Sequence, residues 1–125
     1  EGKNVWIAGD IGPIPVNGTE DAAAAADEYY EIAKTFAETG VKVLDFETFA
    51  DLDGILPAIK KIRAEYDMFI AVSFSVNQFG YSAAGLSAKR LLADAAAVPG
   101  IDAVGLNCGT GSYAPDPGKS GTSGG

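Results

Sequence analysis

The 125-residue sequence contains no histidine and only one cysteine, Cys108. Histidine is the commonest metal ligand and the usual acid–base group near neutral pH, so its absence excludes the most frequent kinds of metal and acid–base site. A single cysteine also cannot form an internal disulfide. Any metal or nucleophile chemistry must therefore depend on Cys108 and oxygen ligands, or on a further chain.

Basic residues are scarce as well: the sequence has 9 lysines and arginines and 17 aspartates and glutamates, which gives a net charge of −8. This balance argues against nucleic acid and against anionic membrane surfaces as partners. No apolar run in the sequence is long enough to cross a bilayer, and we expect no signal peptide. We therefore expect a cytoplasmic protein. The length suits one domain or a piece of one. Because the first residue is Glu1 rather than methionine, we expect the chain to begin inside a longer protein.

Apolar runs typical of strands alternate with helical patterns along the chain. Strands are predicted at 4–9, 41–48, 68–76 and 101–107. Helices are predicted at about 20–39, at 87 to about 96, and over a run of apolar residues at helical spacing that starts near 52 and ends at about 65. Thr19 and Ser87 are expected to cap helices, and Gly40 to end one. Pro57 should either kink the second helix or delay its regular part.

The order β-α-β-α-β-α-β predicts parallel strands joined by right-handed crossovers. An open doubly wound sheet and an arc of a (β/α)8 barrel both fit this order. Polar or small residues occupy one face near the ends of three strands: Asp45 and Glu47, then Ser73 and Ser75, then Asn107. A barrel produces this pattern because the lumen-facing strand ends carry the site. We predict an α/β fold that is half of a (β/α)8 barrel, with four strands and three helices in residues 1–111 and a flexible Gly/Ser-rich tail in 112–125.

Several residues at predicted strand ends could carry chemistry. Cys108 could be a zinc ligand, a nucleophile or simply a small buried hydrophobe. Asp45 and Glu47 could form an acid–base pair or bind a ligand ammonium, or they could be solvated residues at the end of a strand. Asp10 and Asn107 lie at equivalent positions, where they could contact a ligand or make hydrogen bonds that cap a loop.

Four segments, in order, resemble the homocysteine S-methyltransferase family, which includes the homocysteine-binding module of cobalamin-dependent methionine synthase and betaine–homocysteine methyltransferase. The segments are Ala8-Gly9-Asp10-Ile11-Gly12-Pro13, Asp45-Phe46-Glu47-Thr48-Phe49, Val72-Ser73-Phe74-Ser75-Val76 and Gly105-Leu106-Asn107-Cys108-Gly109-Thr110-Gly111. The resemblance implies the third to sixth strands of a (β/α)8 barrel. It also implies methyl transfer to the thiol of homocysteine to form methionine, with zinc activating that thiol.

The resemblance assigns roles to individual residues. Cys108 matches the first zinc thiolate, and Glu47 matches a residue that contacts the amino group of homocysteine. Asn107 matches the floor beside the metal. We therefore expect Glu47, Asn107 and Asp10 to bind substrate and Cys108 to bind metal. The methyl donor differs among members, so cobalamin, folate, a sulfonium or betaine could supply the methyl group of the intact protein.

The sequence also departs from the family pattern. The other two zinc cysteines, an adjacent pair, are absent, and so is the N-terminal strand segment that helps to hold substrate. We expect an incomplete zinc site and a fragment that is inactive alone, whose partner is the remainder of the barrel. The alternative is a catalytically inactive structural half-barrel that associates through its open strand edges, for example with a second copy. A weaker alternative is a different phosphate- or carboxylate-binding (β/α) enzyme.

Overall fold

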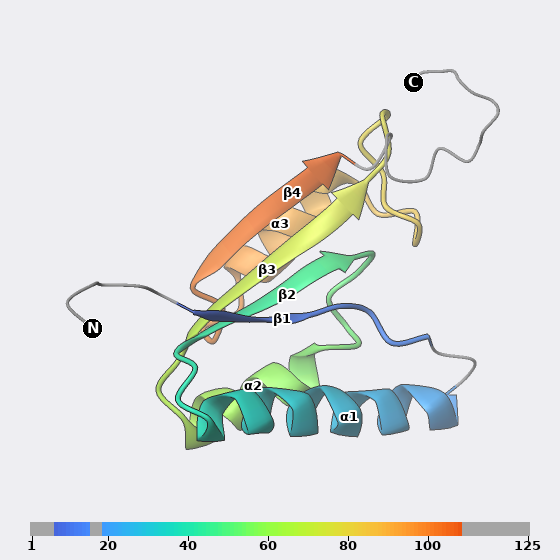
Figure 1. Cartoon of the computed structure of the whole chain (residues 1–125). Coiled ribbons are helices and arrows are strands. Elements are labelled where there is room, and N and C mark those ends of the chain that lie inside the picture. The colour runs from blue at the N-terminus through green and yellow to red at the C-terminus, as the bar shows by residue number, and fades with distance from the viewer. Residues whose placement is uncertain (1–6, 16–18, 109–125) are drawn as a thin grey trace, which may run out of the picture.

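The computed structural model describes residues 7–15 and 19–108, in which four strands and three helices alternate (Figure 1). The elements are β1 (Ala8–Ile11), α1 (Thr19–Glu38), β2 (Val43–Phe49), α2 (Leu56–Glu65), β3 (Phe69–Val76), α3 (Ala88–Ala96) and β4 (Ala103–Cys108). All strand pairs are parallel, and the strands lie in the sheet in chain order, β1-β2-β3-β4. This α/β arrangement confirms the predicted fold class and is consistent with half of a (β/α)8 barrel.

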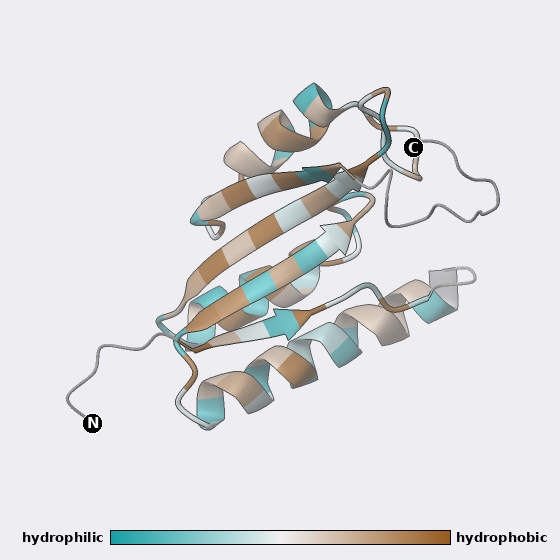
Figure 2. Cartoon of the chain, turned by 45° about the horizontal axis from the view of Figure 1, so that its top comes forward, coloured by the Kyte–Doolittle hydropathy of each residue, from teal (hydrophilic) through white to brown (hydrophobic). Residues whose placement is uncertain are grey.

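One face of the sheet packs against the helices and forms the core. Its central side chains, Leu44, Phe46, Ile70 and Phe74, are completely buried. They share one hydrophobic cluster with residues from all three helices: Ala25, Tyr29, Ala33, Ala58, Ile59, Ile62, Leu91 and Ala95. Hydrophobic and hydrophilic residues alternate along the strands in Figure 2, as expected for a sheet with one covered face. The helices therefore lie on what would be the outside of a barrel.

The opposite face of the sheet corresponds to the barrel lumen, and we call it the open face. Its central residues are small or polar and only partly buried, as at Asp45, Ser73, Ser75 and Gly105. Within residues 7–15 and 19–108, no helix covers this face. Polar side chains can remain on it because they keep contact with water, which would cost several kcal/mol to lose without a partner.

The helix boundaries follow the signals that the sequence provides. Ser87 caps α3, because its Oγ accepts a hydrogen bond from the backbone N–H of Arg90 at 3.1 Å. Pro57 occupies the first turn of α2, which starts at Leu56, so the proline delays the regular helix rather than kinking it. Gly40 follows α1 with a φ of 95°, a backbone conformation that favours glycine. The side chain of Thr19, the predicted cap of α1, lies outside the described residues.

The strand boundaries differ from the predicted ones by a few residues. β1 continues to Ile11 instead of stopping at Gly9, because Asp10 and Ile11 pair with Asp45 and Phe46 of β2. β4 continues to Cys108, which pairs with Val76. Pairing with a neighbouring strand extends these elements beyond the apolar runs that predicted them. The predicted tail at 112–125 lies outside the described residues, as do residues 4–6 of the first predicted strand.

A larger difference occurs at the end of β2. Strict alternation predicts that Phe49 shares the open face with Glu47. Instead, Thr48 has a φ of 62°, and the pairing with β3 shifts in register between Phe46 and Phe49. This bulge turns Phe49 to the helix side, where it is 6% exposed and packs near Tyr29. The sequence gives no signal for it, because a β-branched residue rarely adopts a positive φ.

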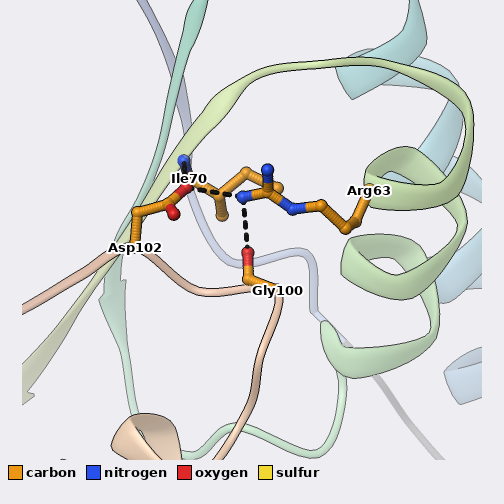
Figure 3. A network of polar contacts seen from close by, with 4 residues as sticks. All are labelled: Arg63, Ile70, Gly100 and Asp102. Carbon is orange, nitrogen blue, oxygen red and sulfur yellow. Dashed lines mark hydrogen bonds and ion pairs between the residues drawn. The ribbon is translucent and has the colours of Figure 1, made fainter.

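A network of polar contacts joins three elements at the N-terminal end of the sheet (Figure 3). The Asp102 carboxylate accepts hydrogen bonds from the backbone N–H of Ile70 at 2.8 Å and from the Arg63 guanidinium at 2.5 Å. Arg63 also donates to the carbonyl of Gly100 at 2.8 Å. The Ile70 hydrogen bond, with the Arg63 charge, lowers the pKa of Asp102. We call these residues the Arg63–Asp102 clamp, since they tie α2 to the starts of β3 and β4.

None of the helices within the described ranges is both long enough and apolar enough to cross a membrane.

Candidate functional site at the C-terminal end of the sheet

Three carboxylates meet on the open face at the C-terminal ends of β1 and β2. Asp10 lies directly opposite Asp45 in the parallel pairing, and Glu47 follows two residues later on the same face. Oxygen atoms of these three side chains lie within 4.8 Å of one another. We call this group the carboxylate cluster. It is positioned by the register of β1 against β2, which the sequence alone did not give.

A close approach of backbone to side chain holds β1 against α1. Gly9 faces α1, and a Cβ atom added there would lie 2.6 Å from the ring of Phe36. Only glycine therefore lets β1 lie this close to α1. The next residue, Asp10, then points to the open face by the alternation of a strand.

The negative charges of Asp45 and Glu47 oppose each other. A hydrogen bond with Asp45, the negative charge of Asp45 and desolvation together raise the pKa of Glu47. The raised pKa means that the folded protein resists a second negative charge at this point. A cation bound between the carboxylates would relieve that repulsion. The cluster is therefore suited to an ammonium group or a metal ion.

The bulge at Thr48 fixes the end of β2 beside Glu47. The Thr48 hydroxyl donates to the carbonyl of Glu47 at 2.6 Å, and its backbone N–H donates to the Ser73 hydroxyl on β3 at 3.4 Å. A residue held at positive φ in a strand stores strain, which is commoner at functional sites than elsewhere. The bulge thus lies immediately after the cluster, one residue before β2 ends at Phe49.

Asn107 and Cys108, the other two predicted site residues, lie on opposite faces of β4. Asn107 pairs with Ser75 and belongs to the open face, as the cluster does. Cys108 pairs with Val76, whose side chain belongs to the helix-covered face, although Cys108 itself is exposed. Cys108 is not part of the group of possible metal ligands formed by Asp10, Asp45 and Glu47. The structure therefore brings Asp10 and Glu47 together and leaves Cys108 apart from them.

The connection between β3 and α3 presents two aromatic rings at the same end of the sheet, which sequence reasoning described only as a loop. The Asn77 side-chain oxygen accepts hydrogen bonds from the backbone N–H groups of Phe79 and Tyr81, at 2.9 and 3.1 Å. Gly80 allows the turn with a φ of 86°. Phe79 and Tyr81 are 74% and 50% exposed. The Asn-x-x-Gly spacing is the signal that could have predicted this turn.

The described residues do not fit a complete zinc site. Zinc in a catalytic site takes about three protein ligands, usually nitrogen or sulfur. Cys108 offers one sulfur, but β3 separates β4 from β2, which places the backbones of those strands about 10 Å apart. The carboxylate cluster by itself offers only oxygen, which harder cations such as Mg²⁺, Ca²⁺ and Mn²⁺ prefer.

The fold agrees with a comparison against known families. A family model described as homocysteine S-methyltransferase matches residues 1–116. The chain belongs to the homocysteine S-methyltransferase family. A comparison with curated proteins finds no match. Family membership agrees with the half-barrel and supports methyl transfer as the class of reaction, and (β/α)8 enzymes carry their active sites at the C-terminal ends of the strands.

Proposed function

We propose that this chain forms the central part of an enzyme that transfers a methyl group to the thiol of homocysteine, forming methionine. Family membership supports the reaction class. The observation that carries the proposal for this chain is the carboxylate cluster, in which Asp10, Asp45 and Glu47 meet at the active-site end of the sheet. A substrate with an ammonium group is the ligand that such a cluster favours.

In the proposed mode of binding, the substrate ammonium lies between Glu47 and Asp10. Each carboxylate accepts a hydrogen bond from the ammonium, and such charge-assisted bonds are shorter and stronger than neutral ones. Asn107, on the same face of β4, contacts the rest of the substrate. The chain's own contribution is therefore to hold and orient the amino acid, which brings the substrate thiol to a fixed position relative to the methyl donor.

Chemically, the reaction forms a bond from sulfur to the methyl carbon and breaks the bond from that carbon to the donor. The thiol gives up its proton, since a thiolate is the nucleophilic form. Cys108 is the proposed contribution of this chain to a zinc site, and in the family's chemistry that zinc supplies the acidity of the thiol. Because the described residues do not complete such a site, we propose that this chain alone lacks the activity.

Binding of homocysteine tests the proposal without requiring activity. We expect the chain to bind homocysteine better than 4-mercaptobutanoate, which lacks only the amino group, when each is titrated calorimetrically. Glu47→Gln should weaken homocysteine binding about 10-fold, since a charged hydrogen bond contributes roughly 1.5–3 kcal/mol. Asp67→Asn, at an exposed residue just before β3, is the matched control and should change nothing. Equal affinity of the wild type for both ligands would overturn the proposed mode of binding.

A second candidate function is a structural half-barrel that associates through its open edges. Two exposed apolar residues favour it, because Ile7 next to β1 and Leu106 in β4 are 66% and 39% exposed. β1 and β4 are the edge strands of the sheet, and unpaired edges invite pairing. Sedimentation equilibrium should then show a dimer that Leu106→Ser weakens. A monomer mass at high concentration would contradict this candidate.

A further inference from the structure

A cavity of about 400 Å³ lies on the helix side of the sheet, away from the open face. Its walls come from the connection after β1, the first half of α1 and the connection after β2. The apolar part of the lining includes Pro13, Ile14, Ala22, Ala25, Tyr29 and Phe49. The bulge at Thr48 separates this cavity from the carboxylate cluster, because Phe49 faces the helices while Glu47 faces the open side. The proposed methyl transfer makes no use of the cavity.

The wall on the α1 side is fixed by hydrogen bonding and ring packing. The hydroxyl of Tyr29 accepts a hydrogen bond from the backbone N–H of Ile14 at 2.6 Å. Its ring meets the ring of Phe49 edge to face, with centroids 5.6 Å apart, and Tyr29 is only 4% exposed. These contacts hold the connection after β1 against α1. The space exists because residues 22 and 25, one helical turn apart, are both alanine.

The polar side chains of the lining are acidic. Asp51 and Asp53, from the connection after β2, both line the cavity. Burial raises the pKa of Tyr29, and the negative charge of Asp51 raises it further, as expected when a carboxylate lies near the phenol. Among the described residues that line the cavity, none is a lysine or an arginine. The cavity therefore combines apolar walls with two acidic side chains.

We propose that this cavity binds a small organic cation with an apolar body of one or two rings. The ammonium or other cationic group lies against Asp51 and Asp53, and the ring system lies against Ala22, Ala25 and Phe49. The volume falls within the range of about 300–1,000 Å³ that is typical of small-molecule sites, which are mostly apolar with a few polar groups that orient the ligand. The overall charge of −8 also favours a cation over an anion.

A pair of probes with opposite charge tests the proposal. Tryptamine carries an ammonium on an indole, and 3-(indol-3-yl)propanoate carries a carboxylate on the same ring. Each is titrated into the ¹⁵N-labelled 125-residue protein. We expect tryptamine to shift the amide signals of Ala22, Ala25 and Gly54 in a saturable manner, whereas the anion binds at least 10-fold more weakly.

Two pairs of variants locate the binding. Ala22→Leu adds bulk inside the cavity at an exposed residue, where the change should not disturb the core, and should weaken tryptamine binding at least 10-fold. Ala23→Leu, exposed at the next residue and outside the lining, is its control. Asp51→Asn should weaken binding several-fold, whereas Asp27→Asn, on the exposed side of α1, should not.

Three results would overturn the proposal: no saturable shift with tryptamine, equal affinity for the anionic probe, or equal affinity in the Ala22→Leu and Ala23→Leu proteins. The experiment is independent of the proposed methyl transfer, because Glu47→Gln should leave tryptamine binding unchanged and Asp51→Asn should leave homocysteine binding unchanged.

Discussion

Carboxylates at the two ends of the sheet have opposite electrostatic surroundings. At the N-terminal end, Asp102 has a guanidinium and a backbone N–H as partners, and its pKa is lowered. At the C-terminal end, Asp10, Asp45 and Glu47 lie within 4.8 Å of one another, and the pKa of Glu47 is raised. A charged carboxylate thus stabilises the fold at one end and opposes it at the other.

This difference assigns separate tasks to the two ends. The Arg63–Asp102 clamp ties elements that are far apart in the sequence, as expected at the end of a (β/α)8 sheet that serves stability. The carboxylate cluster leaves repulsion that the proposed substrate ammonium would relieve. Mutations at the two ends should therefore change stability in opposite directions.

The largest expected effect is the loss of the clamp. Asp102→Ala removes the partner of Arg63 and of the Ile70 N–H together, so we expect the free energy of unfolding to fall by about 2 kcal/mol, the range for hydrogen bonds to charged groups. Urea unfolding measures the change. Asp67→Ala, at an exposed aspartate near the same end, is the control and should have little effect. An equal loss of stability in both variants would contradict the claim that the partners of Asp102 stabilise the fold.

A smaller effect of opposite sign is expected at Glu47. The pKa of Glu47 is raised in the folded state. Its stabilising contribution is therefore present when the pH is below the ordinary Glu value of 4.5, and it is lost as the pH rises through the raised pKa. Glu47→Gln should therefore stabilise the protein near neutral pH, by about 0.5 kcal/mol for a partly exposed charge. Asp102 has the opposite pH dependence, because its pKa is lowered in the folded protein. Its contribution to stability is present when the pH is above the ordinary Asp value of 3.8, and it is lost as the pH falls through the lowered pKa. Thermal unfolding between pH 3 and 8 would separate the two, and a destabilised Glu47→Gln protein at pH 7 would contradict the account.

The smallest effect is expected at Asp10, the most exposed member of the cluster. Like charges directly opposite each other on neighbouring strands destabilise a sheet, and Asp10 lies opposite Asp45. Asp10→Asn should therefore stabilise the protein by about 0.3 kcal/mol, toward the lower end of the range for cross-strand pairs. Asp27→Asn on α1 serves as the control in the same unfolding measurement. A loss of stability on substitution of Asp10 would show that its charge supports the fold.

Local signals in the sequence predicted the helices and strands well, because the interactions behind these signals involve residues that are close together in the sequence. Ser87 caps its helix and Pro57 starts one, because each acts on its own turn. Asp45 and Glu47 share the open face because side chains alternate along a strand, and this was also predicted.

Features that depend on contacts between distant segments could not be predicted. The clamp joins Arg63 to Asp102, and the cavity depends on Tyr29 meeting Ile14 and Phe49. The bulge at Thr48 broke the alternation that was otherwise a reliable guide, since nothing in its residue type indicates a positive φ. β4 also continues through Cys108, one residue beyond the predicted end at Asn107, so alternation places Cys108 on the face opposite Asn107. Whether Cys108 binds a metal stays a prediction.

The most direct test of the central claim is the pKa of Glu47, measured by ¹³C NMR of the carboxyl carbons with and without homocysteine. The account predicts a Glu47 pKa above its ordinary value in the ligand-free protein and a fall when homocysteine binds, because a nearby ammonium favours the charged carboxylate. The pKa of Asp102 at the other end should not move. A Glu47 pKa that stays unchanged at saturating homocysteine would contradict the claim that the carboxylate cluster binds the substrate.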